Sequence, residues 1–143
     1  MRKNQSPSKP ANAALVKGSP SHELRIIGGQ WKRSKIKVID KPELRPTPDR
    51  VRETLFNWLG QDLTGWKCLD AFAGTGALGF EAASRGAAKV VMVESNAPAC
   101  RALQATKEKL GAVQVDIYQG DAASRMAALN IEFDVVFLDP PYD

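Results

Sequence analysis

The sequence predicts an α/β fold: a parallel sheet with helices on both faces, preceded by a small basic β-hairpin. Three observations support this fold. In the second half of the chain, short apolar segments alternate with segments of helical periodicity. A glycine-rich loop follows the first apolar segment, and a pair of prolines ends the last one. The 143 residues are 43% hydrophobic and 25% charged, a composition typical of globular proteins.

Charge is distributed unevenly along the chain. Residues 1–53 contain 13 Lys or Arg and 5 Asp or Glu, a net charge of +8, whereas residues 54–143 contain 7 and 11, a net charge of −4. This asymmetry favours a polyanionic partner for the first segment. No apolar run reaches the length of about 18 residues that spans a bilayer, so no membrane partner is expected. Two distant cysteines and one histidine argue against a metal site, and no metal ligands are expected.

Composition divides the chain into three regions. Residues 1–22 are rich in Ser, Pro, Lys and Asn without periodicity, which predicts a disordered leader. Residues 23–46 are expected to form the basic β-hairpin and a proline-punctuated loop, with Gly28-Gly29 as the hairpin turn. Residues 47–143 form the N-terminal part of the larger domain. Five hairpin cations are expected to contact phosphates: Arg25, Lys32, Arg33, Lys35 and Lys37.

An amphipathic helix is expected over residues 48–59. Thr47 suits its N-cap and Pro48 its first helical position. Apolar residues recur at helical spacing, at Val51, Leu55, Trp58 and Leu59. The opposite face holds polar residues, among them Arg50 and Arg52.

The remaining elements alternate between strand and helix. Apolar strands are expected at residues 66–70, 89–94, 113–118 and 133–138. Helices are expected at residues 77–84, 97–110 and 121–129, the second beginning at Asn96 or Ala97 and ending at Gly111. Apolar strands joined by helices predict a parallel sheet that is covered on both faces.

The loop from Asp70 to Gly76 lies where the first strand turns into a helix. Its D-x-x-x-G-x-G spacing matches neither a dinucleotide fingerprint nor a phosphate-binding P-loop, and it suits an uncharged nucleoside-like ligand. Glu94, at the end of the second strand, could accept hydrogen bonds from two ribose hydroxyls, or it could be a solvated strand end. Asp121 could accept from the amine of adenine, could cap a helix, or could do both.

The fourth strand ends in Asp139-Pro140-Pro141-Tyr142. Two prolines make a rigid exit that holds the aspartate in place. The carboxylate of Asp139 and the carbonyl of Pro140 could then accept both hydrogens of a planar amino group. Tyr142 offers an aromatic face for an extruded base. A simple strand-terminating turn is the alternative interpretation.

Together these motifs resemble class I S-adenosylmethionine-dependent amino-methyltransferases, which have a Rossmann-like sheet. DPPY is similar to their catalytic motif, and DAFAGTGALGFEAASRGA to their cofactor motif. The segments LRIIGGQWKRSKI and LRPTPDRVRETLFNWL resemble the bacterial 16S ribosomal RNA guanine-N2 methyltransferases of the RsmD type. The resemblance covers roughly residues 24–143.

The resemblance implies methyl transfer from S-adenosylmethionine to the N2 amine of a guanine in 16S ribosomal RNA, giving S-adenosylhomocysteine without a metal. It implies a cytoplasmic protein, with a monomer sufficient and either naked RNA or an assembled small subunit as substrate. The implied catalytic residues are Asp139, Pro140, Pro141 and Tyr142. The implied cofactor-binding residues are Asp70, Phe72, Ala73, Gly74, Gly76, Glu94, Asp121 and Ala122. The RPTPDRVRE segment contains Thr47, Arg50 and Arg52. Arg50 and Arg52 are expected to bind RNA.

The chain departs from the family in one respect. The resemblance implies a sheet of seven strands, and since the sequence stops one residue after Tyr142, strands five to seven are expected to be missing. Two alternatives therefore stand beside the guanine-N2 function. One is an adenine-N6 methyltransferase acting on DNA or RNA, since DPPY serves both chemistries. The other is an inactive, truncated fragment that binds adenosylmethionine or RNA.

Overall fold

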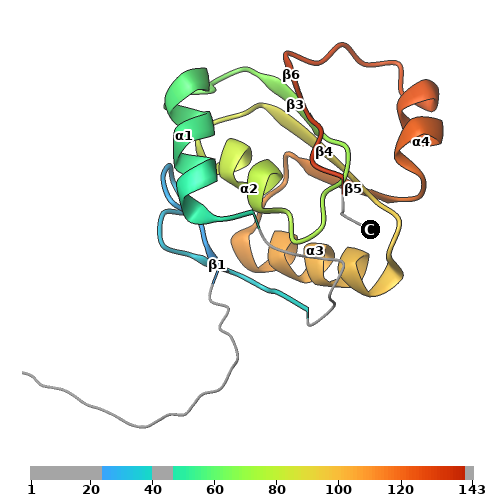
Figure 1. Ribbon diagram of the computed structural model, residues 1–143, viewed down its shortest axis with the longest axis horizontal. Helices are drawn as coiled ribbons and strands as arrows, with labels where there is room; N and C mark the ends of the chain where they lie inside the picture. The colour runs from blue at the N-terminus through green and yellow to red at the C-terminus, as the bar shows by residue number, and fades with distance from the viewer. Residues whose placement is uncertain (1–23, 40–46, 141–143) are drawn as a thin grey trace, which may run out of the picture.

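The computed structural model of the chain describes residues 24–39 and 47–140. The expected leader at residues 1–22 lies outside the described residues, as do Pro141 and Tyr142, and the three-region division stays a prediction. The expected fold is confirmed: strands and helices alternate after a small hairpin (Figure 1). Among the described helices, none combines the length and apolar character needed to cross a membrane.

Four parallel strands form the central sheet in the order β5-β4-β3-β6. Their bounds are Lys67–Asp70 for β3, Lys89–Glu94 for β4, Val115–Gln119 for β5 and Val135–Phe137 for β6. From β3 the chain moves outward through β4 to β5, then returns to place β6 on the other side of β3. The strand order therefore reverses between β3 and β6. Open α/β sheets bind ligands at such a reversal, beyond the carboxyl ends of the strands.

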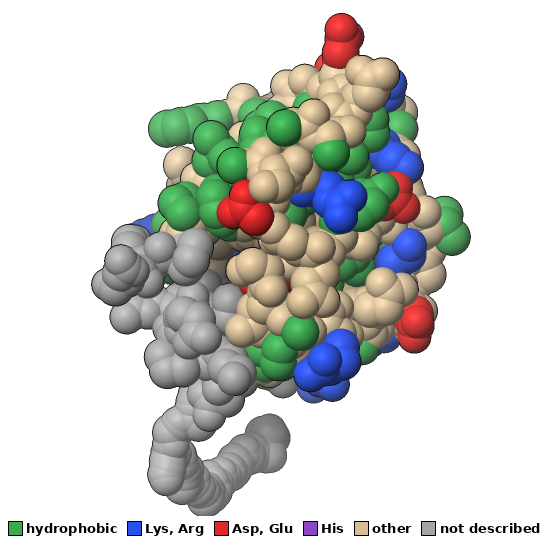
Figure 2. Space-filling view, turned by 90° about the vertical axis from the view of Figure 1, so that its right-hand side faces the viewer, with side chains coloured by type: hydrophobic (Ala, Val, Ile, Leu, Met, Phe, Trp, Pro, Cys, Tyr) green, Lys and Arg blue, Asp and Glu red, His purple; other side chains and the backbone are tan. Residues whose placement is uncertain are grey.

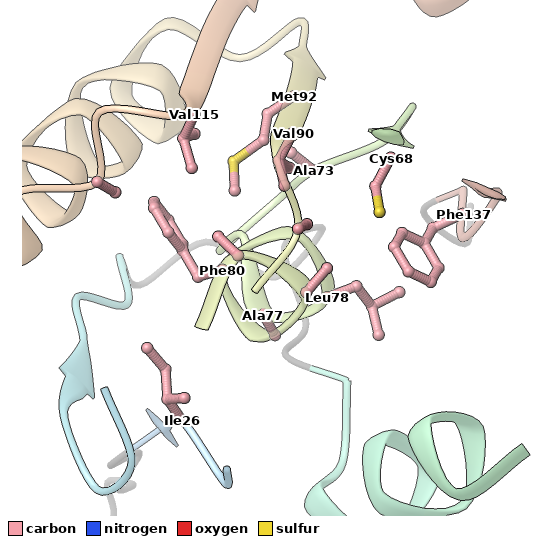
Figure 3. Packing of buried hydrophobic residues seen from close by; sticks show 14 of the residues in the cluster. Ile26, Cys68, Ala73, Ala77, Leu78, Phe80, Val90, Met92, Val115 and Phe137 are labelled. Carbon is pink, nitrogen blue, oxygen red and sulfur yellow. The ribbon is translucent and has the colours of Figure 1, made fainter. Parts of the chain in front are cut away.

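Helices cover both faces of the sheet. Their bounds are Asp49–Leu59 for α1, Ala77–Ser84 for α2, Ala97–Leu110 for α3 and Ala122–Ala128 for α4. Phe56 of α1, Phe80 of α2 and Leu103 of α3 share one buried cluster. Ala122 of α4 packs in a second cluster that contains Leu69, Val91 and Val93 of the sheet. In Figure 3, the ring of Phe80 points toward Val115 and Met92, whereas Phe137 lies beside Cys68 and Leu78.

The helix bounds agree with the expected ranges to within one residue. Asn96 caps α3, because its Oδ1 accepts from the Ala99 N–H at 2.9 Å, and Gly111 ends the helix in a left-handed conformation. The N-cap expected at Thr47 is wrong. Pro48 occupies that position without a side-chain cap, and its extended backbone leaves Thr47 one residue too early to reach the first turn. The Thr47 hydroxyl donates to Asp139 instead.

The hairpin differs from the expected tight turn. Strands β1 (Leu24–Arg25) and β2 (Lys35–Ile36) have two residues each, and residues 26–34 connect them. Gly28-Gly29 lies against α2: the Gly28 N–H donates to Glu81 at 2.8 Å. A Cβ at Gly29 would lie 2.0 Å from the Ser84 carbonyl oxygen. The two glycines thus permit close approach to a helix rather than a two-residue turn.

A buried ionic cluster joins the hairpin, α1 and α2. Glu81 is fully buried and accepts from the Ile27 and Gly28 N–H groups, at 2.9 and 2.8 Å. It also accepts from Arg52 Nη1 at 3.2 Å and from Arg85 Nε at 2.9 Å. The RNA contact expected for Arg52 is wrong, because its side chain is 0% exposed and its charge is neutralised by Glu81.

Candidate functional site

Three carboxylates gather at the carboxyl edge of the sheet. Asp70 ends β3, Glu94 ends β4, and Asp139 follows β6 by two residues. Asp70 interacts electrostatically with both of the others, which places all three on one side of the reversal in strand order. Figure 2 views the molecule from the side toward which these strand ends point in Figure 1, and it shows acidic, basic and hydrophobic side chains interspersed.

Glu94 is held by two backbone groups. Its Oε1 accepts from the Gly74 N–H at 2.8 Å, and its Oε2 accepts from the Asn96 N–H at 2.9 Å. The residue is 8% exposed. Because each carboxylate oxygen has two lone pairs, both oxygens retain a site for a further donor. The backbone therefore orients Glu94 and leaves it able to accept from two ligand hydroxyls.

Gly74 leaves open space beside this carboxylate. Its φ of +56° lies in the left-handed region that favours glycine. A Cβ added there would meet no atom within 4 Å, so glycine is not required by packing at this position. The first glycine of the loop thus presents backbone without a side chain to the space next to Glu94. Gly76 differs, since a Cβ there would lie 2.6 Å from the Phe80 ring.

Asp70 lies beneath the loop, with an exposed fraction of 1%. Its Oδ2 accepts from the Gly79 N–H at 3.0 Å, in the first turn of α2. Burial raises the pKa of Asp70 to about 7, and the charges of Asp139 and Glu94 act in the same direction. The carboxyl thus anchors the start of α2, and its cofactor contact stays a prediction.

Asp121 is the N-cap of α4. Its Oδ2 accepts from the Ser124 N–H at 2.9 Å, and this hydrogen bonding lowers the pKa of the exposed carboxyl below its usual value. The capping alternative is confirmed, and the adenine contact stays a prediction. The neighbouring Ala122 is buried, Phe72 is half-buried, and the buried Ala73 donates its N–H to the Val93 carbonyl at 2.9 Å.

Asp139 is exposed beyond β6, and its Oδ2 accepts from the Thr47 hydroxyl at 3.0 Å. Pro140 follows it on the surface. The contact joins two residues that are 92 positions apart, so no local sequence pattern predicts it.

The hairpin cations lie on a different part of the molecule. Lys32, Arg33, Lys35 and Lys37 are exposed, as are Arg25 and Arg50. The Lys35 carbonyl accepts from Lys109 Nζ at 2.8 Å, which ties the hairpin to α3. A pocket of about 260 Å³ lies there, lined in part by Lys37 and Thr106, and none of its lining residues belongs to the carboxylate site. Within the described ranges, no group of His, Cys, Asp or Glu side chains is arranged to hold a metal ion.

Comparison with known proteins places this site in a family. Residues 24–143 match the family described as "Conserved hypothetical protein 95". The chain is 45% identical over 124 residues to the Escherichia coli "Ribosomal RNA small subunit methyltransferase D", covering 87% of this chain and 63% of that protein. The protein of the same name from Haemophilus influenzae is 42% identical over 124 residues, covering 84% of this chain and 64% of that protein.

A solved structure, of the Escherichia coli protein yhhF, superposes with a TM-score of 0.77 at 41% identity, covering 85% of this chain and 65% of that one. The chain thus spans less than two thirds of the length of these relatives. The resemblance read from the glycine loop, the RPTPDRVRE segment and DPPY is confirmed, and the chain belongs to this RsmD-type family.

Proposed function

We propose that the protein transfers a methyl group from S-adenosylmethionine to the exocyclic N2 amine of a guanine in 16S ribosomal RNA. The observation that carries the proposal is the placement of Asp139-Pro140 at the strand-order reversal, beside the Gly74–Glu94 pair. Relatives named for methylation of the small-subunit RNA support the substrate class. A ribosomal RNA substrate implies a cytoplasmic reaction.

The residues around Glu94 fit the nucleoside part of the cofactor. Its two oxygens are oriented by the Gly74 and Asn96 N–H groups and retain lone pairs for the two ribose hydroxyls. The bare backbone of Gly74 admits the ligand without a steric clash. When bound, S-adenosylmethionine supplies a methyl group already activated on a sulfonium, and S-adenosylhomocysteine is the product.

Asp139 and Pro140 orient the acceptor amine. One carboxylate oxygen of Asp139 accepts one amino hydrogen, and the Pro140 carbonyl accepts the other. Holding both hydrogens favours a tetrahedral nitrogen and directs its lone pair toward the methyl group. Asp139 acts here by orientation and charge, because the nitrogen loses its proton readily after the methyl group is attached. In this proposal Pro141 and Tyr142 complete the base-binding segment, and the hairpin cations and Arg50 contact RNA phosphates.

Methylation of defined RNA tests the proposal. The full-length protein is incubated with labelled S-adenosylmethionine and either naked 16S ribosomal RNA or assembled small subunits, and the modified nucleoside is identified by mass spectrometry. We expect N2-methylguanosine. N6-methyladenosine would support the adenine alternative, whereas cofactor binding without methyl transfer would indicate a binding module.

Asp139→Ala provides the matching variant. We expect turnover to fall by at least about 100-fold, because a positioned acceptor at the reacting centre is removed. The cofactor affinity measured by calorimetry should change less than about twofold, since Glu94 and Gly74 are intact. Asp116→Ala is the control, because Asp116 pairs with Lys89 on the surface and not with the site. Retained turnover in Asp139→Ala contradicts the assigned role.

A further inference from the structure

Thr47 makes a contact that the helix after it does not require. The residue precedes Pro48, the N-cap of α1, and no side chain caps this helix. Its hydroxyl lies 3.0 Å from Asp139 Oδ2. The hydroxyl is thus directed across the molecule to the carboxylate that the proposed function uses.

Packing of α1 explains why Thr47 reaches Asp139. Near its middle, α1 packs on β6 through Phe56, whose ring centroid lies 6.0 Å from that of Phe137. Phe137 precedes Asp139 by only two residues. In its first turn, the buried Arg52 binds Glu81 of α2 at 3.2 Å. The first contact joins α1 to β6 and the second joins the start of α1 to α2, and together they hold α1 beside the end of β6.

The contact restrains Asp139 in a site where acidic groups accumulate. Asp70 from β3 interacts electrostatically with both Asp139 and Glu94 of β4, and all three groups are acidic. A hydroxyl donates one hydrogen bond, and a carboxylate is its stronger acceptor when ionised. Thr47 therefore occupies Oδ2 of Asp139, which leaves Oδ1 for an incoming donor.

We infer that Thr47 is a positioning residue for the proposed methyl transfer: its hydroxyl holds the Asp139 carboxylate in the orientation that receives the acceptor amine. The inference rests on the proposed function of Asp139. The residue before the N-cap of α1 would then contribute to the reaction as well as to the fold.

Two substitutions at this position separate the hydroxyl from the side-chain shape. Thr47→Val keeps the shape and removes the donor, whereas Thr47→Ser keeps the donor. In the full-length protein we expect Thr47→Val to lower kcat about tenfold, as loss of a hydrogen bond to a charged group predicts. The KM for RNA and the cofactor affinity should stay within about twofold, and Thr47→Ser should retain most of the activity. Thr54→Val, at an exposed position of α1, is the matched control.

A second measurement does not depend on activity. Crystal structures of the variants should show the Asp139 carboxylate turned from its wild-type orientation in Thr47→Val and held in that orientation in Thr47→Ser, since only serine keeps the donor. Wild-type kcat together with an unchanged carboxylate orientation in Thr47→Val would overturn the inference. If the wild type transfers no methyl group, the proposed function fails instead, and the crystal structures alone decide whether Thr47 holds Asp139.

Discussion

Two groups of charged side chains in this molecule are built differently. In the cluster beneath the hairpin, Glu81 lies between Arg52 and Arg85 and also accepts from two backbone N–H groups. At the carboxyl edge of the sheet, the acidic groups accept only from backbone N–H groups and one hydroxyl. Among the described residues, none of these edge carboxylates forms a salt bridge to a cation.

The difference separates stability from binding. The acceptor sites of Glu81 are taken by the protein itself, so this carboxylate joins three parts of the chain and can bind nothing else. Glu94 and Asp139 retain lone pairs at the reversal in strand order, where open α/β sheets bind their ligands. Removing charge from the first group should therefore reduce the stability of the fold, and removing it from Glu94 or Asp139 should mainly reduce binding or turnover.

The largest effect is expected for Glu81→Gln. The amide keeps the shape but leaves Arg85 buried without a counter-charge and leaves Arg52 with only the exposed Asp49 as its counter-charge. Breaking a buried ion pair from one side costs about 3–5 kcal/mol of unfolding free energy. Denaturant unfolding followed by circular dichroism measures this loss.

Asp116→Asn is the control for that experiment, because it makes the same chemical change in the more exposed pair with Lys89. Surface pairs contribute about 0–1 kcal/mol. An equal loss in both variants would mean that the Glu81 cluster does not join the hairpin to the core as described.

Asp70→Asn should change how stability depends on pH. The pKa of Asp70 is about 7 in the folded chain, above its ordinary value of 3.8. The folded state then binds the proton more tightly than the unfolded state, so this contribution to stability is present at low pH and is lost as pH rises from about 4 to 7. The wild type should lose on the order of 3 kcal/mol relative to Asp70→Asn over this range.

Unfolding curves at pH 4.5, 6 and 8 give this difference directly. An asparagine oxygen can still accept from the Gly79 N–H, so the anchor of α2 is preserved. If the free energies of unfolding of wild type and Asp70→Asn depend on pH in the same way, Asp70 is not a buried acid with a raised pKa.

Much of the sheet and its helices was predictable because their signals are local. The periodicity of residues 97–110, with Asn96 before and Gly111 after, determines both ends of α3. Arg52 was placed on the wrong face because its burial depends on Glu81, which lies 29 positions later. Helical spacing shows which residues share a face, but not which buried partner an arginine will find.

The site was predictable to a similar degree. Glu94 and Asp139 were identified because strand ends of a parallel sheet meet at one edge. The prediction of a hairpin turn at Gly28-Gly29 was wrong, because two adjacent glycines are equally typical of a close approach between segments, here to Ser84. The Thr47–Asp139 contact has no signature at all, because it arises from the packing of α1 on β6.

Glu94→Gln should have its main effect on binding. Its amide would present one acceptor and one donor where two hydroxyls need acceptors, so cofactor affinity should fall by about 10- to 30-fold. The free energy of unfolding should fall by about 1 kcal/mol, less than for Glu81→Gln, because no cation is left unpaired. Calorimetric titration with S-adenosylmethionine measures the first effect, with Glu53→Gln on the exposed side of α1 as control. Unchanged affinity would remove Glu94 from the cofactor site.

The smallest effect concerns the exposed cations. Lys32 and Arg33 lie in the connection between β1 and β2, and their substitution by Gln should flatten the dependence of RNA affinity on salt. Each lost phosphate contact lowers the slope of log K against log salt by about 0.7–0.9, so the double variant should lower it by up to about 1.4–1.8. The matched control replaces Lys67 and Lys89 by Gln. These two lysines begin β3 and β4, at the amino ends of the strands. Equal slopes in the two variants would mean that the hairpin carries no particular share of RNA binding, because net charge alone would then account for the salt dependence.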